Sequence, residues 1–179
     1  MFRGEKDVTI QIRSARDGDV ATITEIYNHA VRTTTAIWNE RVVDMANRME
    51  WLRAHEETDL PVLVAVAADG QVAGYATFGP WRAWDGYRHT VEHSVYVHKD
   101  RQRAGIGRAL MVALLEEARQ RGYHVMVAGI ESGNVGSIHL HETLGFSVVG
   151  QCRQVGCKFG RWLDLTFMQI ILDERASPD

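Results

Sequence analysis

A short run, YVHKDRQRAGIGRALM at residues 96–111, places two glycines, Gly105 and Gly107, between an apolar segment and a helix-like one. Basic side chains surround both glycines. The first amide groups of a helix have no partner within the helix, and the helix dipole adds partial positive charge at that end. Glycine lets the backbone approach a ligand closely. This strand–loop–helix segment therefore predicts a phosphate-binding site, with a solvated surface loop as the alternative.

The two common nucleotide-binding loops fit this segment poorly. A Walker A loop requires G-x-x-x-x-G-K-[ST], which does not occur in the sequence. A dinucleotide-binding fingerprint requires a third small residue, where Leu110 stands here, and it opens the first βα unit of its domain. The present loop follows the fourth predicted strand. The sequence therefore favours neither a Walker A loop nor a dinucleotide-binding fingerprint.

The periodicity of apolar residues predicts a β-α-α-β-β-β-α-β-α-β-β order. This order favours an α+β or α/β fold, with helices on both faces of a sheet. The predicted strands are 9–13, 61–67, 71–79, 90–98, 124–130, 146–155 and 162–172, and the predicted helices are 17–31, 43–57, 107–120 and 134–145. In the second helix, Met45, Met49 and Leu52 are expected on one apolar stripe.

Length and charge limit the alternatives further. The chain has 179 residues, 45% of them hydrophobic, which predicts one domain, spanning 9–173, with flexible ends at 1–8 and 174–179. The net charge of -3 provides no general field for nucleic acid, and no apolar run reaches the roughly 20 residues of a membrane helix. Two cysteines, Cys152 and Cys157, cannot form a disulfide framework or a zinc site with a second pair. We expect a cytoplasmic protein.

Three sets of residues resemble the GCN5-related N-acetyltransferase (GNAT) family. Gln102–Gly107 fits its Q/R-x-x-G-x-G/A loop, and NVGSIHLHETLGF at 134–146 resembles its N-x-x-[AS]-x-x-x-[YH]-x-x-x-GF helix. Longer runs, including TVEHSVYV and KFGRWLDLTFMQ, resemble phosphinothricin acetyltransferases, within them the branch acting on methionine sulfoximine and methionine sulfone. The similarity extends from Ile12 to Leu172. It implies the GNAT fold, an α/β/α sandwich with a mixed, mostly antiparallel sheet, with acetyl-CoA as co-substrate and no metal, and a homodimer.

The resemblance also implies which residues hold coenzyme A. Backbone groups of the strand before the glycine loop would bind the pantetheine arm, the loop would bind the pyrophosphate, and two polar residues of a later helix would contact the cofactor. In this sequence those residues are Val95, Tyr96, Val97, Arg103, Ala104, Gly105, Ile106, Gly107, Arg108, Asn134 and Ser137.

Two candidates follow for proton transfer. Alternation along a strand places Glu92, Ser94 and Tyr96 on one face and His93 on the other. Glu92 is the candidate general base, direct or through a water, because a carboxylate in a partly apolar cleft has a raised pKa. An ordinary charge at a strand end is the alternative. His141 occupies the position where the family often has a tyrosine that protonates the thiolate, and a solvated surface histidine is its alternative.

The amine acceptor should bind beside this strand. An arginine fork binds carboxylates bidentately, which makes Arg82 the first candidate for the carboxylate of an amino acid. The resemblance adds Ala83, Trp84, Glu92, His93 and Ser94, while Thr34, Thr35 and Trp38 could close the pocket. Tyr87 and Arg88 belong to the same polar segment. The charges of Lys158, Arg161 and Asp164 would serve the pocket or a subunit interface.

Two other chemistries are unfavourable. His89-Thr90-Val91-Glu92-His93 spells H-x-x-E-H, but on a strand its ends lie about 13 Å apart, too far for one zinc ion. A cysteine acyl-enzyme would need Cys152 or Cys157 near the central strand, and neither is close in sequence. The remaining alternatives are acetyl transfer to another amine or a protein N-terminus, and a coenzyme A-binding regulator without catalysis.

Overall fold

The computed structural model describes residues 10–178. The predicted flexible segment 1–8, residue 9 of the first predicted strand, and residue 179 lie outside the described residues. The described segment 173–178 contains no helix or strand, and Arg175 in it donates a hydrogen bond to the Gly122 carbonyl at 2.6 Å. No helix within residues 10–178 has the length and apolar character needed to cross a membrane.

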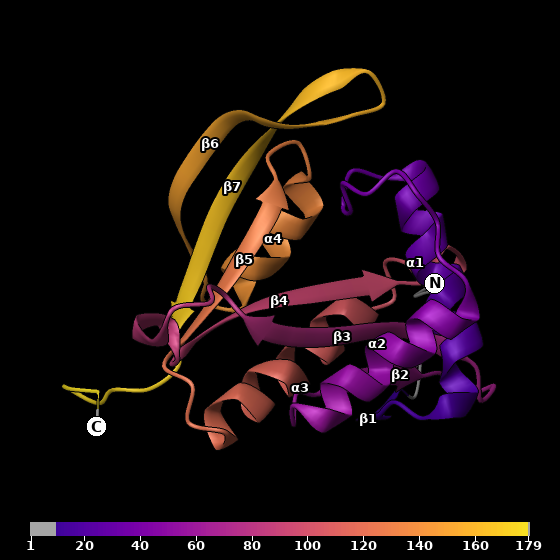
Figure 1. Ribbon diagram of the computed structural model, residues 1–179, viewed down its shortest axis with the longest axis horizontal. Coiled ribbons are helices and arrows are strands. Elements are labelled where there is room, and N and C mark those ends of the chain that lie inside the picture. Colours follow the sequence, from indigo (N-terminus) through magenta and orange to yellow (C-terminus); the bar gives the residue numbers. More distant parts are fainter. Residues whose placement is uncertain (1–9, 179) are drawn as a thin grey trace, which may run out of the picture.

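Within residues 10–178, seven strands form one sheet in the order β1-β2-β3-β4-β5-β7-β6 (Figure 1). Every neighbouring pair is antiparallel except β4 and β5, which are parallel. This confirms the predicted mixed, mostly antiparallel sheet. The strands are β1 (Gln11–Ser14), β2 (Val62–Val66), β3 (Val72–Pro80), β4 (Thr90–Val97), β5 (Val125–Glu131), β6 (Ser147–Lys158) and β7 (Arg161–Ile171).

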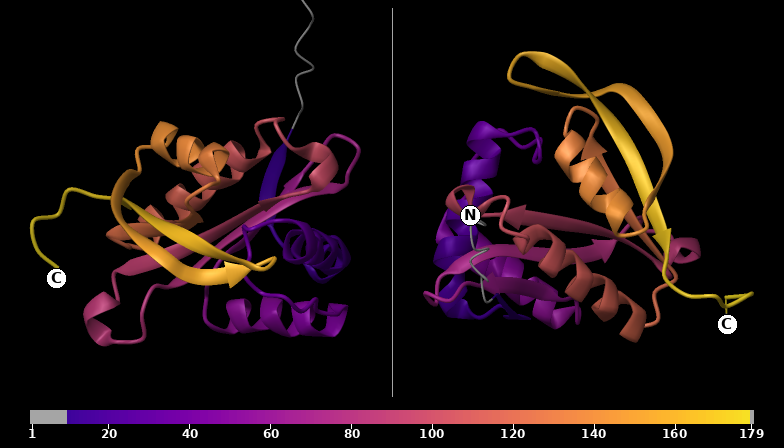
Figure 2. Two further views of the ribbon diagram at one scale, coloured as in Figure 1. Left: turned by 90° about the horizontal axis from the view of Figure 1, so that it is seen from above. Right: turned by 180° about the vertical axis from the view of Figure 1, so that it is seen from behind.

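Four α-helices in the described part of the chain complete a three-layer arrangement. They are α1 (Val20–Thr33), α2 (Met45–Glu57), α3 (Ile106–Gln120) and α4 (Val135–Thr143). The view from above in Figure 2 shows α1 and α2 on one face of the sheet, with α3 and α4 on the other. The α/β/α architecture and the predicted order of elements are both confirmed.

The apolar periodicity of α3 explains its place in the core. Its buried side chains recur at helical spacing and pack against the sheet: Ile106, Leu110, Met111, Leu114, Leu115 and Ala118. The stripe predicted for α2 is only partly right. Leu52 is buried with Val20 and Val62 and Met49 packs against them, but Met45 is 54% exposed. The first turn of α2 thus lies beyond that cluster, although Met45 has the helical spacing expected of a residue on the same apolar stripe.

The sheet opens in its middle. β4 pairs with β5 through Thr90, Val91 and Glu92, and no further pairing is formed by the described residues beyond Glu92. Figure 1 shows the two strands diverging from this point, with α4 beside β5 and α1 across the opening. The β6–β7 hairpin reverses at Phe159 and Gly160, which have φ angles of 52° and 72°. The middle of the sheet therefore presents unpaired strand edges for a ligand.

Candidate active site

A cavity of about 900 Å³ occupies the opening between β4 and β5. Its walls come from α1 and the loop after it, the end of β4, the glycine loop, the start of α4 and the turn of the β6–β7 hairpin. These segments are far apart in sequence. The diverging strands therefore bring the predicted phosphate loop and the predicted catalytic strand to one site.

The glycine loop is a helix N-terminus of the predicted kind. Gly105 is the N-cap of α3 with φ 75°, and Arg103 also has a positive φ of 60°. The Gly105 carbonyl accepts the bond from the Ala109 amide, so the amides of Ile106, Gly107 and Arg108 precede the first intrahelical donor. These amides border the cavity. They provide an anion-binding surface, to which Arg103 and Arg108 add positive charge.

The end of β4 provides a second type of contact. Val95, Tyr96 and Val97 line the cavity and pair on their other side with β3. Because the pairing with β5 stops at Glu92, the backbone of this segment can bond an extended ligand arm as a neighbouring strand would. This edge fits an amide-containing arm such as pantetheine.

Helix α4 closes the cofactor end of the cavity. Asn134 and Ser137 both line it, and the Asn134 Oδ1 accepts a hydrogen bond from the Ser137 amide at 3.1 Å. The Asn134 side chain therefore caps α4 and fixes its first turn against the cavity. All residues predicted to hold coenzyme A line this cavity except Ala104, which is exposed.

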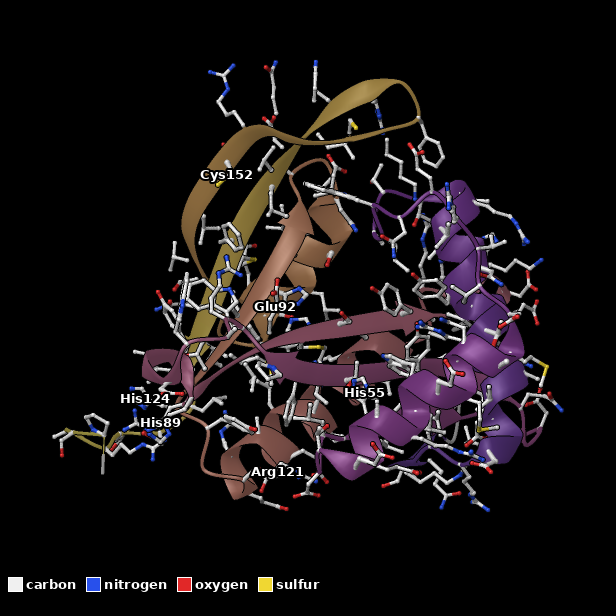
Figure 3. The ribbon with its side chains drawn as sticks, in the orientation of Figure 1. His55, His89, Glu92, Arg121, His124 and Cys152 are labelled. Carbon is white, nitrogen blue, oxygen red and sulfur yellow. The ribbon has the colours of Figure 1, made fainter. Side chains whose placement is uncertain are left out.

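Glu92 lies where β4 and β5 separate, and Figure 3 shows it at the closed end of that opening. Burial raises the pKa of the Glu92 carboxyl, and the positive charge of Arg82 offsets part of that rise. An ionised carboxylate with a raised pKa is a better proton acceptor near neutral pH. This is the electrostatic setting that a general base requires.

Gly129 on β5, which the sequence analysis missed, makes room for this carboxylate. A Cβ at position 129 would lie 3.0 Å from the Glu92 Oε1 and 3.6 Å from a methyl carbon of Leu165. The glycine therefore brings β5 close to Glu92, and the neighbouring apolar atoms account for the burial. Only the parallel register Glu92↔Val127, invisible in the sequence, reveals this neighbour.

The other predicted acceptor residues lie outside the cavity wall. Arg82 and Ala83 are exposed and Trp84 is 73% exposed, while Ser94 on β4 is half-buried. The Arg82 guanidinium lies 4.5 Å from the Trp81 ring centre. None of these four residues, nor Glu92 or His93, is among the residues lining the cavity. The structure thus groups the predicted cofactor residues but leaves the predicted acceptor residues beside them.

The loop after α1 forms a further wall that is held from two sides. Thr34 and Thr35 line the cavity, and the Thr35 hydroxyl donates to the Glu131 carboxylate at 2.9 Å. Lys158, 2% exposed, donates from its Nζ to the carbonyls of Thr34, at 2.7 Å, and Ile37. Lys158 therefore serves this wall of the pocket, one of the two roles expected for it.

Two more side chains join this wall to the hairpin. The Trp38 ring lies against Gly156, where a Cβ would be 2.2 Å from the indole carbons. Arg161 borders the cavity, whereas Asp164 accepts a hydrogen bond from the Gln154 amide inside the hairpin. The pocket wall thus depends on contacts between segments about 120 residues apart, such as Lys158 with Ile37.

His141 and His93 form a buried pair behind the cavity. Their Nε2 atoms are 2.9 Å apart, and the His141 Nδ1 is 2.6 Å from the Ser137 carbonyl oxygen. His141 is 1% exposed and its neighbour Leu140, not His141 itself, lines the cavity. It is therefore not a solvated surface residue, and its role as proton donor stays a prediction.

Metal and cysteine chemistry find no support in the geometry. Among residues 10–178, no group of three or more His, Cys, Asp and Glu side chains could hold a metal ion. Cys152 and Cys157 are exposed on β6. Figure 3 shows Cys152 well apart from Glu92. Tyr87 and Arg88 are exposed beyond the start of β4.

Comparison with known proteins identifies the class. The acetyltransferase (GNAT) family model matches residues 23–146, and the chain belongs to this family. It is an acetyl-CoA-dependent N-acetyltransferase. A structure from Salmonella typhimurium solved with its cofactor acetyl-CoA superposes with a TM-score of 0.92 and is 59% identical, covering 96% of this chain and 98% of that one.

Individual proteins of known activity are also similar to this chain over most of its length. The L-amino acid N-acyltransferase MnaT of Escherichia coli is 60% identical over 95% of this chain and 98% of its own. The L-methionine sulfoximine/L-methionine sulfone acetyltransferase of Salmonella typhimurium is 60% identical over 94% and 98%. The phosphinothricin N-acetyltransferase of Alcaligenes faecalis is 38% identical over 88% and 80%. The resemblance read from the sequence is thereby confirmed.

Proposed function

We propose that this enzyme acetylates the amino group of a small amino acid analogue, foremost L-methionine sulfoximine and L-methionine sulfone, with phosphinothricin as a further substrate. The observation that carries the proposal is the single cavity that runs from the anion-binding turn of α3 along the free edge of β4. The named substrates of the relatives support the acceptor class. Acetylation would convert the basic amino group of such an analogue into a neutral amide.

In the proposal, acetyl-CoA supplies a thioester whose carbonyl carbon is the electrophile. The amides at the start of α3 bind its pyrophosphate, with Arg103 and Arg108 adding charge. The free edge of β4 from Val95 to Val97 bonds its pantetheine arm, and Asn134 and Ser137 contact it from α4. The fit of these residues to one continuous cavity supports the assignment.

Glu92 acts as the general base of the proposed reaction. The neutral amine forms the new N–C bond, the C–S bond breaks, and the amine proton passes to Glu92 directly or through a water. A backbone N–H of the free β4 edge stabilises the oxyanion. The thiolate then takes a proton from water in the cavity, and the hydroxide left behind is neutralised by the amine proton that Glu92 releases. The raised pKa of Glu92 supports its part, because the carboxylate must hold a proton briefly.

The acceptor binds on the Glu92 side of the opening. Arg82 pairs with its carboxylate, and its charge already influences Glu92, which supports their proximity. Ala83, Trp84, His93 and Ser94 complete the predicted acceptor set. Thr34 and Thr35 close the site from the loop after α1, which Lys158 holds in place.

A homodimer would cover apolar side chains that this chain leaves exposed. Trp162 is 68% exposed on β7, and Val148 and Val155 are 54% and 55% exposed on β6. Trp84, at 73%, is unusually exposed for a tryptophan in a predicted substrate pocket. A second copy over these surfaces would bury them, which light scattering during size-exclusion chromatography can measure. Two unpaired, exposed cysteines fit a reducing compartment such as the cytoplasm.

A substrate panel tests the proposal. Purified enzyme is mixed with acetyl-CoA and each of methionine sulfoximine, methionine sulfone, phosphinothricin, free amino acids and a peptide N-terminus, and free thiol is recorded. We expect turnover with the first three and little with the peptide. Turnover with the peptide alone would favour a protein acetyltransferase. Acetyl-CoA binding without turnover of any amine would favour the regulator.

A further inference from the structure

The two buried histidines, His93 on β4 and His141 on α4, lie at the point where β4 leaves β5. The Nε2 atoms are 2.9 Å apart and the ring centres 4.9 Å apart, with planes inclined by only 15°. The distance between the two Nε2 atoms is much shorter than the distance between the ring centres. Each Nε2 atom therefore points toward the other ring. The rings therefore meet edge to edge through an N–H···N hydrogen bond rather than face to face. Phe146 packs edge-on against both rings.

The position of each proton follows from the partners. The His141 Nδ1 lies 2.6 Å from the Ser137 carbonyl oxygen, which can only accept, so Nδ1 carries a proton. In a neutral imidazole the other nitrogen, Nε2, is then an acceptor. The proton between the two Nε2 atoms must therefore belong to His93. This leaves the His93 Nδ1 as an unprotonated, buried acceptor, with no hydrogen-bond partner among the described residues.

Both rings are neutral in this arrangement. Burial lowers the pKa of His93 to about 3, with a contribution from His141, and burial also lowers the pKa of His141. Two imidazolium rings facing each other at 2.9 Å would repel, and no acidic side chain of residues 10–178 is paired with His141. A neutral ring whose only N–H is bonded to Ser137 has no proton directed at the cavity.

We infer that His93 is a positioning residue, which fixes His141 as its Nδ1–H tautomer and joins β4 to α4 across the opening that holds acetyl-CoA. The inference rests on the proposed function for its catalytic consequence. The hydrogen bonds run from His93 to His141, and from His141 to the carbonyl of Ser137, whose amide is bonded to Asn134. Asn134 and Ser137 line the cavity on one side, and Val95, two residues after His93, lines it on the other.

This arrangement sets the distance between the two walls of the cofactor site. Beyond Glu92 no ladder hydrogen bonds are formed between β4 and β5 within the described residues, so the histidine pair takes over the connection. His141 thereby acts on the first turn of α4 rather than on the thiolate. Its expected proton-donor role gives way to a structural one, and the thiolate takes its proton from water.

Variants at position 93 test the connection. Gln can keep an N–H donor near the position of the histidine Nε2, whereas Phe keeps an aromatic ring beside Phe146 but donates nothing. We expect His93→Phe to raise the KM for acetyl-CoA about three- to tenfold, the effect of one lost buried hydrogen bond, with kcat less affected. His93→Gln should raise the KM for acetyl-CoA less than His93→Phe does, because it retains an N–H donor for the His141 Nε2. The exposed His139 on α4 provides the control, as His139→Gln.

Tautomers are measured independently of activity. Long-range proton–nitrogen correlation spectra of the wild-type enzyme, labelled with ¹⁵N-histidine, should show His141 protonated on Nδ1 and His93 on Nε2 at neutral pH. A His141 that carries its proton on Nε2 would overturn the inference. So would a His93→Gln variant as impaired as His93→Phe. Neither result would bear on whether the enzyme acetylates amino acid analogues, which the substrate panel decides.

Discussion

The residues predicted to hold acetyl-CoA lie along one cavity, whereas the residues predicted to hold the amino acid lie on an exposed segment and at the closed end of the opening. The first group belongs to a contiguous strand–loop–helix unit and one helix turn, fixed by backbone geometry such as the positive φ of Gly105. The second group depends on Arg82 and Trp84, which pack mainly against their own segment. Local sequence thus builds the cofactor half, whereas the acceptor half also needs Glu92 beside β5 and the loop after α1, which Lys158 holds from far along the chain.

The largest effect should follow the removal of the base between the two halves. We expect Glu92→Gln to lower kcat by about 10²- to 10⁴-fold, the usual loss for a general base, with the KM for acetyl-CoA nearly unchanged. The acid limb of the pH–rate profile should flatten, because the group that must be ionised is gone. Steady-state kinetics from about pH 5 to 9 measure both effects.

The thermal stability of Glu92→Gln shows whether a loss of kcat comes from misfolding. Burial raises the folded-state pKa of Glu92 above its unfolded value, so wild-type stability falls as the pH rises from the unfolded towards the folded pKa. At neutral pH, Glu92→Gln should therefore unfold at the same or a higher temperature. Exposed Glu57 supplies the matched substitution, Glu57→Gln. A Glu92→Gln enzyme with wild-type kcat and acid limb would reduce Glu92 to a strand-end charge.

A substitution in the glycine loop should damage the cofactor half alone. Gly105 has φ 75°, and a branched residue there costs about 1–2 kcal/mol of backbone strain while crowding the pyrophosphate. We expect Gly105→Val to raise the KM for acetyl-CoA by about 10- to 100-fold. Gly18→Val, at an open position without a positive φ, is the control. Unchanged acetyl-CoA affinity would remove the cofactor assignment.

The glycine loop was predictable from the sequence, and so was much of the fold. The glycines, the apolar spacing of α3 and the alternation in β4 are local patterns, so the order of elements and the cofactor residues followed from them. The register of β4 against β5 has no local signal. Gly129 beside Glu92 and the His93–His141 bond therefore became visible only in three dimensions.

The loop after α1, which carries Thr34 and Thr35, also depends on a contact that the sequence does not reveal. The sequence predicts that the charge of Lys158 serves the pocket or a subunit interface, but it does not show that the side chain is buried and bonded to carbonyls more than 100 residues earlier. A long-range contact of this kind leaves no periodicity in the sequence. Met45 illustrates the converse, since its spacing places it on the stripe of Met49 and Leu52, yet its side chain is 54% exposed.

Removing that buried cation should disturb the acceptor half. Lys158→Met leaves the carbonyls of Thr34 and Ile37 without their donor, and hydrogen bonds to charged groups contribute about 1.5–3 kcal/mol. We expect the free energy of unfolding to fall by about 2 kcal/mol in urea titrations and the KM for the amino acid to rise more than that for acetyl-CoA. Lys99→Met, at an exposed site, is the comparison. If Lys158→Met kept the stability and the KM values of the wild type, the loop after α1 would not depend on Lys158 for its position.

A smaller effect is expected from Arg82, because it is exposed. Exposed ion pairs contribute about 0.2–1 kcal/mol, so Arg82→Ala should raise the KM for the amino acid up to about fivefold. Its charge also lowers the pKa of Glu92, and its loss should move the acid limb to higher pH. A rise above about 100-fold would mean that a closed, desolvated pocket forms around Arg82, as the proposed dimer would allow.

The cysteines should have no effect. Direct transfer needs no acyl-enzyme, and both side chains are exposed on β6, with Cys152 well apart from Glu92 (Figure 3). Replacing Cys152 and Cys157 together by alanine should leave kcat within about twofold of wild type. Mass spectrometry that trapped an acetylated cysteine during turnover would refute direct transfer.

One kinetic comparison tests the division of the site most directly. The KM values for acetyl-CoA and for methionine sulfoximine are measured side by side in wild type, Gly105→Val and Arg82→Ala. The two-part site predicts opposite patterns: Gly105→Val raises the KM for acetyl-CoA and leaves that for methionine sulfoximine within about twofold, and Arg82→Ala does the reverse. Equal increases of both constants in both variants would contradict it.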